Sequence, residues 1–377
     1  MRLVQGNEAV ALAAAHAGCS FYAGYPITPA TEIMELMSRQ LPKSGGVFIQ
    51  FEDEIGALAA CIGAAWGGAR AMTATSGPGF SLMQEHVGYA AMTQTPVVIV
   101  DSQRGGPSTG LPTLPSQGEV MQAQFGSHGD RVAIVLTASS VLEAYQMTVE
   151  AFNLAETYRM PVVLLLDAVV SHMRENVEFP DIPVRERPKP TIDEHFLPFG
   201  PDAPFVPFGS GHHTVVTGMS HDETGLPKSM AGVAVQRMLL GVRDRLRRDA
   251  RDITYYKELA LPDAEVGVLA YGISARPARE AVEILRAEGV KAGLLDLQTL
   301  WPFPDWLLLE KLGRTKGVLV PELNLGQYII PTRATLGAHC RVEGLNRCDG
   351  ELFTPEEIAQ AAKDLAAAVQ MGGVAHD

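Results

Sequence analysis

The stretch Tyr25-Pro26-Ile27-Thr28-Pro29-Ala30-Thr31 decides the fold. It follows a short apolar run at 19–24 and precedes a helix-like pattern at 32–41. Two prolines three residues apart fix φ and remove two backbone donors, so the segment is predicted to be a rigid loop. Its plainest interpretation is a strand-to-helix turn in which Thr28 caps the helix and Pro29 lies in the first helical turn.

The composition is that of an ordinary α/β protein with room for two domains. The chain has 377 residues, of which 46% are hydrophobic and 19% are charged. Its net charge of -13 argues against nucleic acid as a partner, because phosphate binding needs a basic surface. The longest apolar runs, such as 161–166, are far shorter than the roughly 20 residues that span a bilayer. Residues 1–6 show no basic-then-apolar signal, so we expect a cytoplasmic protein with no membrane partner.

The cysteines do not have the spacing of a metal or cluster site. They stand at 19, 61, 340 and 348, and no two form a Cys-x-x-Cys pair. Cys19 and Cys61 lie in apolar surroundings, which favours buried thiols. Cys340 and Cys348 have no histidine at ligand spacing. We therefore expect no metal site and no iron–sulfur cluster on this chain.

Strand-like and helix-like segments alternate from Gln5 to about Asp167. The expected strands lie at 48–51, 70–75, 96–101, 132–136 and 162–167, and the expected helices lie at 55–66, from 76–79 to 92, and from Ser139 or Ser140 to about 158. Such alternation predicts a parallel sheet with helices on both faces. Right-handed crossovers then bring the loops after the strands to one edge, where active groups lie.

Those loops carry the candidate site residues. They are 25–31 after the first strand, Glu52-Asp53-Glu54 after the second, Ser76-Gly77-Pro78-Gly79 after the third, and 103–110 after the fourth. Glu54 runs directly into an apolar helix that would bury it, which is costly for a carboxylate without a partner. Arg104 lies in a glycine-rich loop, where its guanidinium could bind a carboxylate through two parallel hydrogen bonds.

Each of these loops also has a purely structural interpretation. Acidic residues at a helix start complement the helix dipole, and Arg104 could be a surface arginine. The segment 76–79 could be a tight turn, or it could let a ligand approach the backbone closely. It contains no lysine, so it is not a phosphate-binding Walker loop.

The alternation breaks between about 171 and 260. Prolines at 180, 183, 188, 190, 198, 201, 204 and 207 predict a long, stiff connection. His212, His213 and His221 match no standard metal spacing, so we expect a loop folded over the domain junction. The basic segment 243–251 is predicted to be a helix with a solvated face.

A second, smaller α/β domain is predicted from about Pro262. Its expected strands lie at 266–271, 290–297 and 317–320, and its expected helices at 276–288 and 355–369. The predicted organisation is therefore a first domain at 1–180, a proline-rich connection with a helix at 181–260, and a second domain at 261–377.

Together these segments resemble the α subunit of the 2-oxoacid:ferredoxin oxidoreductases, most closely the 2-oxoglutarate type. The segments that carry the resemblance are Tyr25-Pro26-Ile27-Thr28-Pro29, Glu54-Ile55-Gly56-Ala57, Thr75-Ser76-Gly77-Pro78-Gly79, Gln103-Arg104-Gly105-Gly106-Pro107-Ser108-Thr109-Gly110, 217–227 and 321–327. They cover nearly the whole chain in the order that the family has.

The resemblance implies a thiamine diphosphate-enzyme domain of the pyrimidine-binding type, followed by a domain similar to the C-terminal domain of transketolase. The implied reaction converts a 2-oxoacid, coenzyme A and oxidised ferredoxin reversibly into acyl-coenzyme A, carbon dioxide and reduced ferredoxin. Glu54 would be the catalytic glutamate that bonds to N1′ of the aminopyrimidine and activates the cofactor. The remaining implied roles are substrate binding by Thr28, Arg104 and Tyr25, and cofactor binding by Glu54, Pro26, Ile27, Ser76 and Gly77.

The resemblance also implies a partner chain. The sequence contains no Gly-Asp-Gly segment with a downstream Asn for magnesium and diphosphate. A β subunit is therefore expected to supply Mg²⁺, part of the thiamine diphosphate site and a [4Fe-4S] cluster, within an α2β2 assembly that uses ferredoxin and coenzyme A. The alternatives are a pyruvate or broad 2-oxoacid specificity, half of a non-oxidative thiamine enzyme, or a non-catalytic α/β ligand-binding or scaffold protein.

Overall fold

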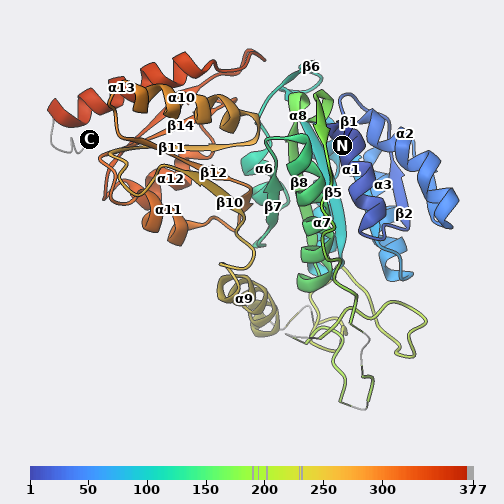
Figure 1. Ribbon diagram of the computed structural model, residues 1–377. Helices are drawn as coiled ribbons and strands as arrows, with labels where there is room; N and C mark the ends of the chain where they lie inside the picture. The colour runs from blue at the N-terminus through green and yellow to red at the C-terminus, as the bar shows by residue number, and fades with distance from the viewer. Residues whose placement is uncertain (189–190, 194, 201–202, 229, 231, 372–377) are drawn as a thin grey trace.

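The computed structural model describes residues 1–188, 191–193, 195–200, 203–228, 230 and 232–371. These residues form two α/β units, each built on its own sheet, with a long connection between them (Figure 1). Within the described residues no helix is long and apolar enough to cross a bilayer.

The larger unit contains the predicted parallel sheet. Its strand order is β13-β7-β8-β5-β4-β2-β3, with β6 on β5. The strands from β7 to β3 are parallel, as predicted, whereas β6 and β13 pair antiparallel. Its elements are β1 (Arg2–Gln5), α1 (Gly6–His16), β2 (Phe21–Gly24), α2 (Thr31–Gln40), η1 (Leu41–Ser44), β3 (Val47–Gln50), α3 (Glu54–Trp66), β4 (Ala71–Thr75), α4 (Pro78–Leu82), α5 (Gln84–Met92), β5 (Val97–Gly105), β6 (Leu111–Pro115), α6 (Val120–Phe125), β7 (Ile134–Thr137), α7 (Val141–Tyr158), β8 (Pro161–Asp167), α8 (Ala168–His172) and β9 (Arg174–Val177).

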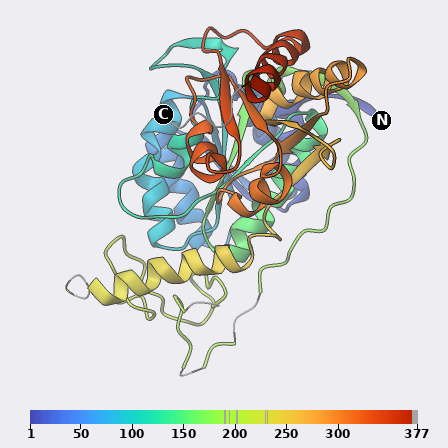
Figure 2. The same ribbon diagram turned by 90° about the vertical axis from the view of Figure 1, so that its left-hand side faces the viewer.

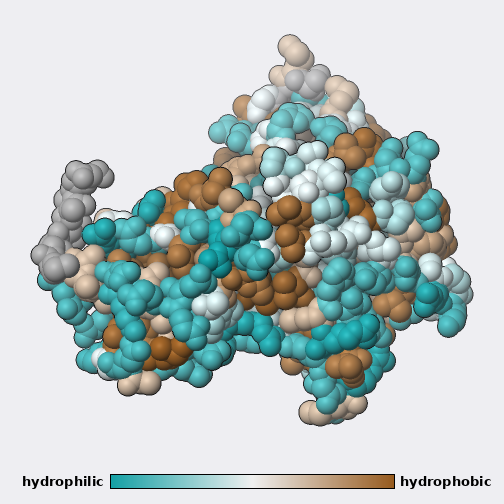
Figure 3. Space-filling model, turned by 90° about the horizontal axis from the view of Figure 1, so that it is seen from above, coloured by the Kyte–Doolittle hydropathy of each residue, from teal (hydrophilic) through white to brown (hydrophobic). Residues whose placement is uncertain are grey.

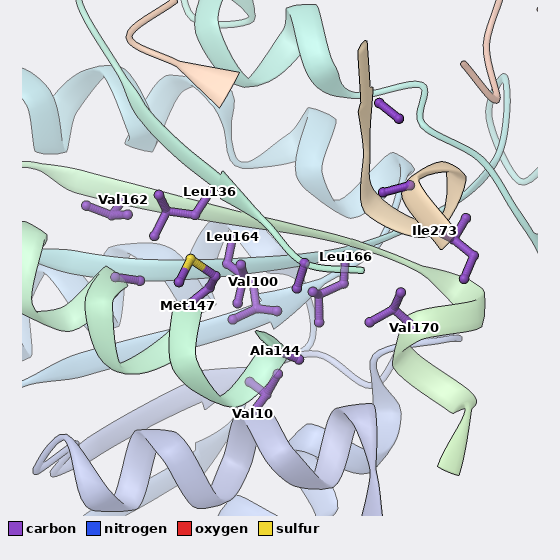
Figure 4. Packing of buried hydrophobic residues seen from close by; sticks show 14 of the residues in the cluster. Val10, Val100, Leu136, Ala144, Met147, Val162, Leu164, Leu166, Val170 and Ile273 are labelled. Carbon is purple, nitrogen blue, oxygen red and sulfur yellow. The ribbon is translucent and has the colours of Figure 1, made fainter. Parts of the chain in front are cut away.

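The apolar strand β5 is buried on both faces because helices cover both sides of the sheet. Val98 and Val100 pack in one core with residues of α1, α2 and α7, whereas Val97 and Ile99 pack in the other with residues of α3, α5 and α6. Figure 4 shows the first of these cores, in which side chains of α1 and α7 meet those of the strands. Burial stabilises each such side chain by about 1.5–3 kcal/mol.

The helix after the deciding loop begins at Thr31, close to the predicted pattern, but Pro29 lies before it and not in its first turn. Thr28 does not cap α2; its N-cap residue is Ala30, which makes no side-chain capping bond. The backbone closes a turn before the helix starts, because the N–H of Ala30 donates to the carbonyl of Ile27 at 2.9 Å. The capping prediction for Thr28 was therefore wrong, whereas Ser140 does cap α7.

The smaller unit is a mixed sheet flanked by helices. Its strand order is β10-β12-β11-β14-β15, in which only β10 pairs antiparallel among the described strands. Its elements are β10 (Tyr256–Leu259), β11 (Val266–Tyr271), η2 (Gly272–Ser274), α10 (Ala275–Ala287), β12 (Ala292–Leu297), α11 (Asp305–Leu312), β14 (Gly317–Glu322), α12 (Ile329–Leu336), β15 (Arg341–Asn346) and α13 (Pro355–Met371). The short strand β13 (Thr299–Trp301) lies in this part of the chain but belongs to the larger sheet.

The proline-rich connection lies against the larger unit, at the end opposite β6 (Figures 1 and 2). Trp66, at the end of α3, holds it there, because the rings of Phe205 and Phe208 lie 4.5 and 5.5 Å from the Trp66 ring. His221 is buried, and its Nε2 lies 3.1 Å from the carbonyl oxygen of Met92. The prediction that this loop folds over the domain junction is therefore wrong. The contacts with Trp66 and Met92 hold the loop at the ends of α3 and α5 instead. The connection then enters α9 (Gly232–Arg248); residues 189–190, 194, 201–202, 229 and 231 lie outside the described residues.

The two units are joined at one edge. Although β13 comes from the second half of the chain, it pairs antiparallel with β7 of the larger sheet. Gln117, just before α6, contacts the smaller unit through both atoms of its amide. Its Nε2 donates to the carbonyl of Tyr271 at 2.9 Å, and its Oε1 accepts from the N–H of Leu323 at 2.9 Å.

Glu322, at the end of β14, orders the turn that reaches Gln117. It is fully buried, and its carboxyl oxygens accept hydrogen bonds from Tyr271 Oη (2.8 Å), Asn324 Nδ2 (3.0 Å), and the N–H groups of Tyr328 (2.8 Å) and Ile329 (2.9 Å). Asn324 Nδ2 also donates to the carbonyl of Gln117 at 2.7 Å.

Replacing this carboxyl group should destabilise the fold. Glu322→Ala leaves buried donors unsatisfied, and we expect the free energy of unfolding to fall by about 3 kcal/mol. Urea denaturation followed by circular dichroism measures it. The control is Glu343→Ala, which removes a half-exposed carboxylate beside Arg341 and should change the free energy by about 0.5 kcal/mol or less. Equal denaturation midpoints for the two variants would contradict this prediction.

Candidate active site

Glu54 is the buried acid at the carboxyl edge of the larger sheet. It is the first residue of α3, whose N-cap Asp53 accepts a hydrogen bond from the N–H of Gly56 at 2.7 Å. Although it lies at a helix start, Glu54 is only 4% exposed. Burial raises its pKa above the usual range, while hydrogen bonds from its own N–H and from Thr75, and the charge of Arg104, oppose the rise. A carboxyl group in this setting keeps its proton to higher pH than an exposed glutamate does.

Two residues of the neighbouring loop fix the Glu54 carboxyl group. The hydroxyl of Thr75, at the end of β4, donates to Glu54 Oε1 at 3.3 Å. The backbone of Gly79 passes so close that an added Cβ would lie 2.1 Å from both Glu54 Oε1 and Thr75 Oγ1. A glycine is therefore required here for steric reasons, and the carboxyl group lies close to the backbone at the start of α4.

Arg104 lies in strand β5 and not in a surface loop. The strand continues to Gly105, beyond the predicted end, because β6 folds back and pairs with it. Arg104 is 6% exposed, so the surface interpretation is wrong. Its NH1 donates to the carbonyl oxygen of Thr28 at 2.7 Å. The side chain also passes over Gly77, where an added Cβ would lie 3.6 Å from Arg104 Cγ.

The structure thus brings Glu54, Gly77 and Arg104 together, with Thr28 joined through its backbone. Ser76 is fully buried beside them, and its hydroxyl has no partner within the described residues. The remaining predicted residues are more open: Tyr25 is 39% exposed, Pro26 and Thr28 are exposed, and Ile27 is half-buried.

Comparison with known proteins shows which family has this arrangement. Residues 12–239 match the family described as pyruvate flavodoxin/ferredoxin oxidoreductase, thiamine diphosphate-binding. Residues 264–358 match core domain II of pyruvate:ferredoxin oxidoreductase. The chain belongs to the pyruvate flavodoxin/ferredoxin oxidoreductase family. This confirms the predicted oxidoreductase and sets aside the scaffold and non-oxidative alternatives.

Relatives within this oxidoreductase family are similar along the whole chain. The 2-oxoglutarate synthase subunit KorA of Methanothermobacter thermautotrophicus is 49% identical over 361 residues, which cover 94% of this chain and 96% of the relative. A solved 2-oxoglutarate:ferredoxin oxidoreductase from Magnetococcus marinus, with 2-oxoglutarate, coenzyme A and succinyl-CoA bound, is 34% identical with a TM-score of 0.89. The match covers 96% of this chain and 65% of that longer chain.

The fold is also shared beyond the oxidoreductase family. A split-gene transketolase is 14% identical, with a TM-score of 0.57 over 97% of this chain and 98% of the other. At that identity the likeness concerns the fold alone. It confirms the predicted pairing of a thiamine diphosphate-type sheet domain with a transketolase-like second domain.

The residues present suit the cofactor that this oxidoreductase family binds. The Glu54 carboxyl group is buried, and the backbone of Gly79 closes one side of it. Its raised pKa allows it to share a proton with a basic ring nitrogen such as that of an aminopyrimidine. No group of three His, Cys, Asp or Glu residues in the described chain is placed to hold a metal ion. Glu54 and the backbone of 76–79 are therefore the groups that could contact the pyrimidine.

Sequence reasoning missed several polar residues behind this site. Asp101, Gln103 and Glu119 are buried on the same side of the sheet as Glu54. The available signal was Asp101 itself, a carboxylate that directly follows the apolar run 97–100 in the sequence. Glu119 and Gln117 gave no comparable signal, because the chain around them is polar and the contacts come from distant elements.

The contact between Gly79 and Glu54 can be tested by adding one methyl group. Gly79→Ala should displace the Glu54 carboxyl group and reduce turnover of the assembled enzyme by ~10²-fold, because small misplacements of reacting groups have effects of that size. Steady-state kinetics at saturating thiamine diphosphate measures this. Gly63→Ala on α3 is the control, since nothing lies within 4 Å of its added Cβ. Near-normal turnover by a folded, cofactor-saturated Gly79→Ala enzyme would show that the carboxyl position is unimportant.

Proposed function

We propose that this chain is the α-type subunit of a 2-oxoglutarate:ferredoxin oxidoreductase. The reaction would convert 2-oxoglutarate, coenzyme A and oxidised ferredoxin reversibly into succinyl-coenzyme A, carbon dioxide and reduced ferredoxin. The observation that carries the proposal is the buried Glu54 carboxyl group beside the Arg104 guanidinium, at the carboxyl edge of a thiamine diphosphate-type sheet. The choice of 2-oxoglutarate is supported by the names of the relatives, whereas the family descriptions name pyruvate.

Each residue of the site has a role in this proposal. Thiamine diphosphate, when bound, supplies the electron sink for decarboxylation. Glu54 holds a proton at its carboxyl group, facing the pyrimidine side. Arg104 binds a substrate carboxylate, for which a guanidinium with several N–H donors is suited, and one of those donors is already fixed on Thr28. Tyr25 and Thr28 line the substrate side, while Pro26, Ile27, Ser76 and Gly77 line the cofactor side.

A partner β subunit would complete the site. Large apolar side chains are exposed on the elements that lead to and from Glu54: Tyr25 at 39% after β2, Val47 at 49% and Ile49 at 39% on the edge strand β3, and Ile55 at 42% on α3. Exposed apolar groups on an unpaired strand edge are typical of a surface that another chain covers. The face above the strand ends also shows hydrophobic patches in its middle (Figure 3).

The β subunit in this proposal carries Mg²⁺, the diphosphate-binding part of the cofactor site and a [4Fe-4S] cluster, and two copies of each chain form the enzyme. Ferredoxin and coenzyme A are the further partners. The division into domains at 1–180, 181–260 and 261–377 is likewise proposed. The four free thiols are consistent with a reducing, cytoplasmic compartment.

Removing the Arg104 guanidinium should weaken substrate binding. A charge-assisted double hydrogen bond contributes about 1.5–3 kcal/mol, so Arg104→Ala should raise the KM for 2-oxoglutarate by ~10- to ~150-fold. Steady-state kinetics of the reconstituted enzyme with 2-oxoglutarate measures the rise in KM. The same measurement with pyruvate in place of 2-oxoglutarate shows which 2-oxoacid the enzyme prefers. Arg276→Ala is the control, because Arg276 is a half-exposed residue of α10 in the smaller unit, paired with Glu175 of β9. An unchanged KM would remove Arg104 from the substrate site.

The chain alone should be inactive. Its cysteines are scattered, with Cys19, Cys61 and Cys340 buried and Cys348 exposed, so they cannot hold a cluster together. Expression without a β subunit, followed by iron analysis and calorimetric titration with thiamine diphosphate and Mg²⁺, should show no iron and weak cofactor binding. Co-expression with the β subunit should restore iron, tight binding and 2-oxoglutarate turnover. Stoichiometric iron on the lone chain would contradict the two-chain arrangement.

A further inference from the structure

The loop after β2 is held at two consecutive carbonyl groups. The carbonyl oxygen of Thr28 accepts a hydrogen bond from Arg104 NH1 at 2.7 Å. The next carbonyl oxygen, that of Pro29, accepts a hydrogen bond from Asn7 Nδ2 at 2.6 Å. Arg104 comes from β5 and Asn7 from the first turn of α1, so two distant segments of the chain hold adjacent residues of the loop. Asn7 has no role in the chemistry proposed for the site.

Asn7 stands on a firmly held part of the structure. The N–H of Gly6 donates to the carbonyl of Met173 at 3.2 Å, and an added Cβ on Gly6 would clash with the carbonyl oxygen of Val170. The start of α1 therefore packs directly against α8. Asn7 itself is fully buried, so it does not reach a substrate. A side chain on a rigid, buried helix start holds its hydrogen-bond partners with little freedom.

The orientation of the Asn7 amide follows from its neighbours. Its Nδ2 carries two N–H groups, which donate to the carbonyl oxygen of Pro29 and, at 2.8 Å, to Glu32 Oε2. The opposite orientation would place the amide oxygen against these two acceptors, which is unfavourable. In the observed orientation Oδ1 is buried and has no hydrogen-bond partner within the described residues. Because a buried acceptor without a donor is costly, stability alone does not explain an asparagine at this position.

The two hydrogen bonds fix the backbone that carries Thr28. The Thr28 side chain is exposed, whereas Pro29 and Ala30 are buried. The N–H of Ala30 closes the turn by donating to the carbonyl of Ile27 at 2.9 Å. Since an exposed side chain is not packed among others, the position of the Thr28 hydroxyl group depends on the backbone on which it stands.

We propose that Asn7 is a positioning residue that holds the Thr28–Pro29 backbone and so directs the Thr28 hydroxyl group toward the substrate. This rests on the proposed function, in which Thr28 and Arg104 bind the 2-oxoacid. Arg104 holds the same loop, but its guanidinium also serves the substrate carboxylate. Asn7 binds only the protein, so the loop keeps one fixed point when Arg104 engages the carboxylate. A binding group that is displaced even slightly loses affinity and rate.

The test is a double-mutant cycle in the assembled enzyme. Asn7→Leu keeps the size of the side chain and removes both donors, whereas Thr28→Val removes the hydroxyl group and keeps the shape. Each single change should raise the KM for 2-oxoglutarate by ~2- to ~10-fold, the effect of losing one neutral hydrogen bond. Because Asn7 acts through Thr28, the double variant should be no worse than Thr28→Val alone. Single effects that multiply in the double variant would overturn the proposal.

Asn153 provides a matched control. It is 3% exposed on α7, its Nδ2 donates to the carbonyl of Pro183 at 3.0 Å, and its Oδ1 accepts from the N–H of Arg185 at 2.8 Å. Asn153→Leu therefore removes the same kind of bond, from an asparagine to a proline carbonyl, in the connection instead of the site loop. It should lower the urea midpoint of the full chain, as Asn7→Leu does, and leave the KM unchanged. An equal rise of KM in both variants would reduce the role of Asn7 to stability and contradict the proposal.

Hydrogen–deuterium exchange of the full chain tests the loop without catalysis. Because the N–H of Ala30 closes the turn, its exchange should become ~2- to ~10-fold faster in Asn7→Leu and stay unchanged in Asn153→Leu. Mass spectrometry of peptides that cover 25–33 measures this rate. Unchanged exchange in Asn7→Leu would show that Asn7 does not hold the loop and would overturn the proposal.

The kinetics separate a failure of this proposal from a failure of the proposed function. If Thr28→Val raises the KM and Asn7→Leu does not, the positioning role is wrong and the substrate site is retained. If Thr28→Val has no effect, Thr28 does not bind the substrate, and the role of Asn7 through it is wrong as well. An assembled enzyme that turns over no 2-oxoacid would overturn the proposed function, whereas the exchange rates would still decide whether Asn7 holds the loop.

Discussion

The hydrogen bond from the Arg104 guanidinium to the carbonyl of Thr28 is the constraint on which the arrangement of the carboxyl edge of the larger sheet depends. Glu54, Asp101 and Glu119 are all buried there, and buried acids without a counter-charge are costly. The charge of Arg104 lowers the pKa of each of them, although burial raises it more, and the strand of Arg104 is held between β4 and β8. Its bond to the carbonyl of Thr28 also fixes the loop after β2 relative to the end of β5. The rigid loop with two prolines is thus located by a guanidinium from a strand 76 residues further along the chain.

The small residues of the neighbouring loop follow from the closeness of these groups. Gly77 has a φ of 46°, and the Arg104 side chain passes directly over it. Gly79 leaves no space for a side chain between its backbone and the Glu54 carboxyl group. The glycines therefore serve the site and not only the turn, which explains why a plain turn interpretation of 76–79 was insufficient.

Local patterns predicted the repeating architecture, whereas contacts between distant segments set the details. The apolar run of β5 and the helix-like periodicity around it predicted a parallel sheet covered on both faces, and the structure agrees. Arg104 was expected in a loop because two glycines and a proline follow it, but pairing with β6 extends the strand. With three residues, β13 is too short to give a strand pattern in the sequence, and it forms a strand because it pairs with β7. Likewise, the docking of the connection on Trp66 depends on ring contacts that proline content does not reveal.

The smaller unit supports the site, although it contributes none of the proposed site residues. Asp167 lies beside Gln103 in the larger sheet, and its carboxyl group accepts the N–H of Ile273, from the smaller unit, at 2.9 Å. Gln117, two residues before Glu119, is held by Tyr271 and Leu323. Without the smaller unit these buried polar groups would lose their partners, at a cost of about 1–3 kcal/mol for each. The turn that carries Glu119 would also lose the hydrogen bonds that hold Gln117. The hydrogen bonds between the units therefore lie next to the polar residues at the end of β5, and the second half of the chain supports the elements that carry the site.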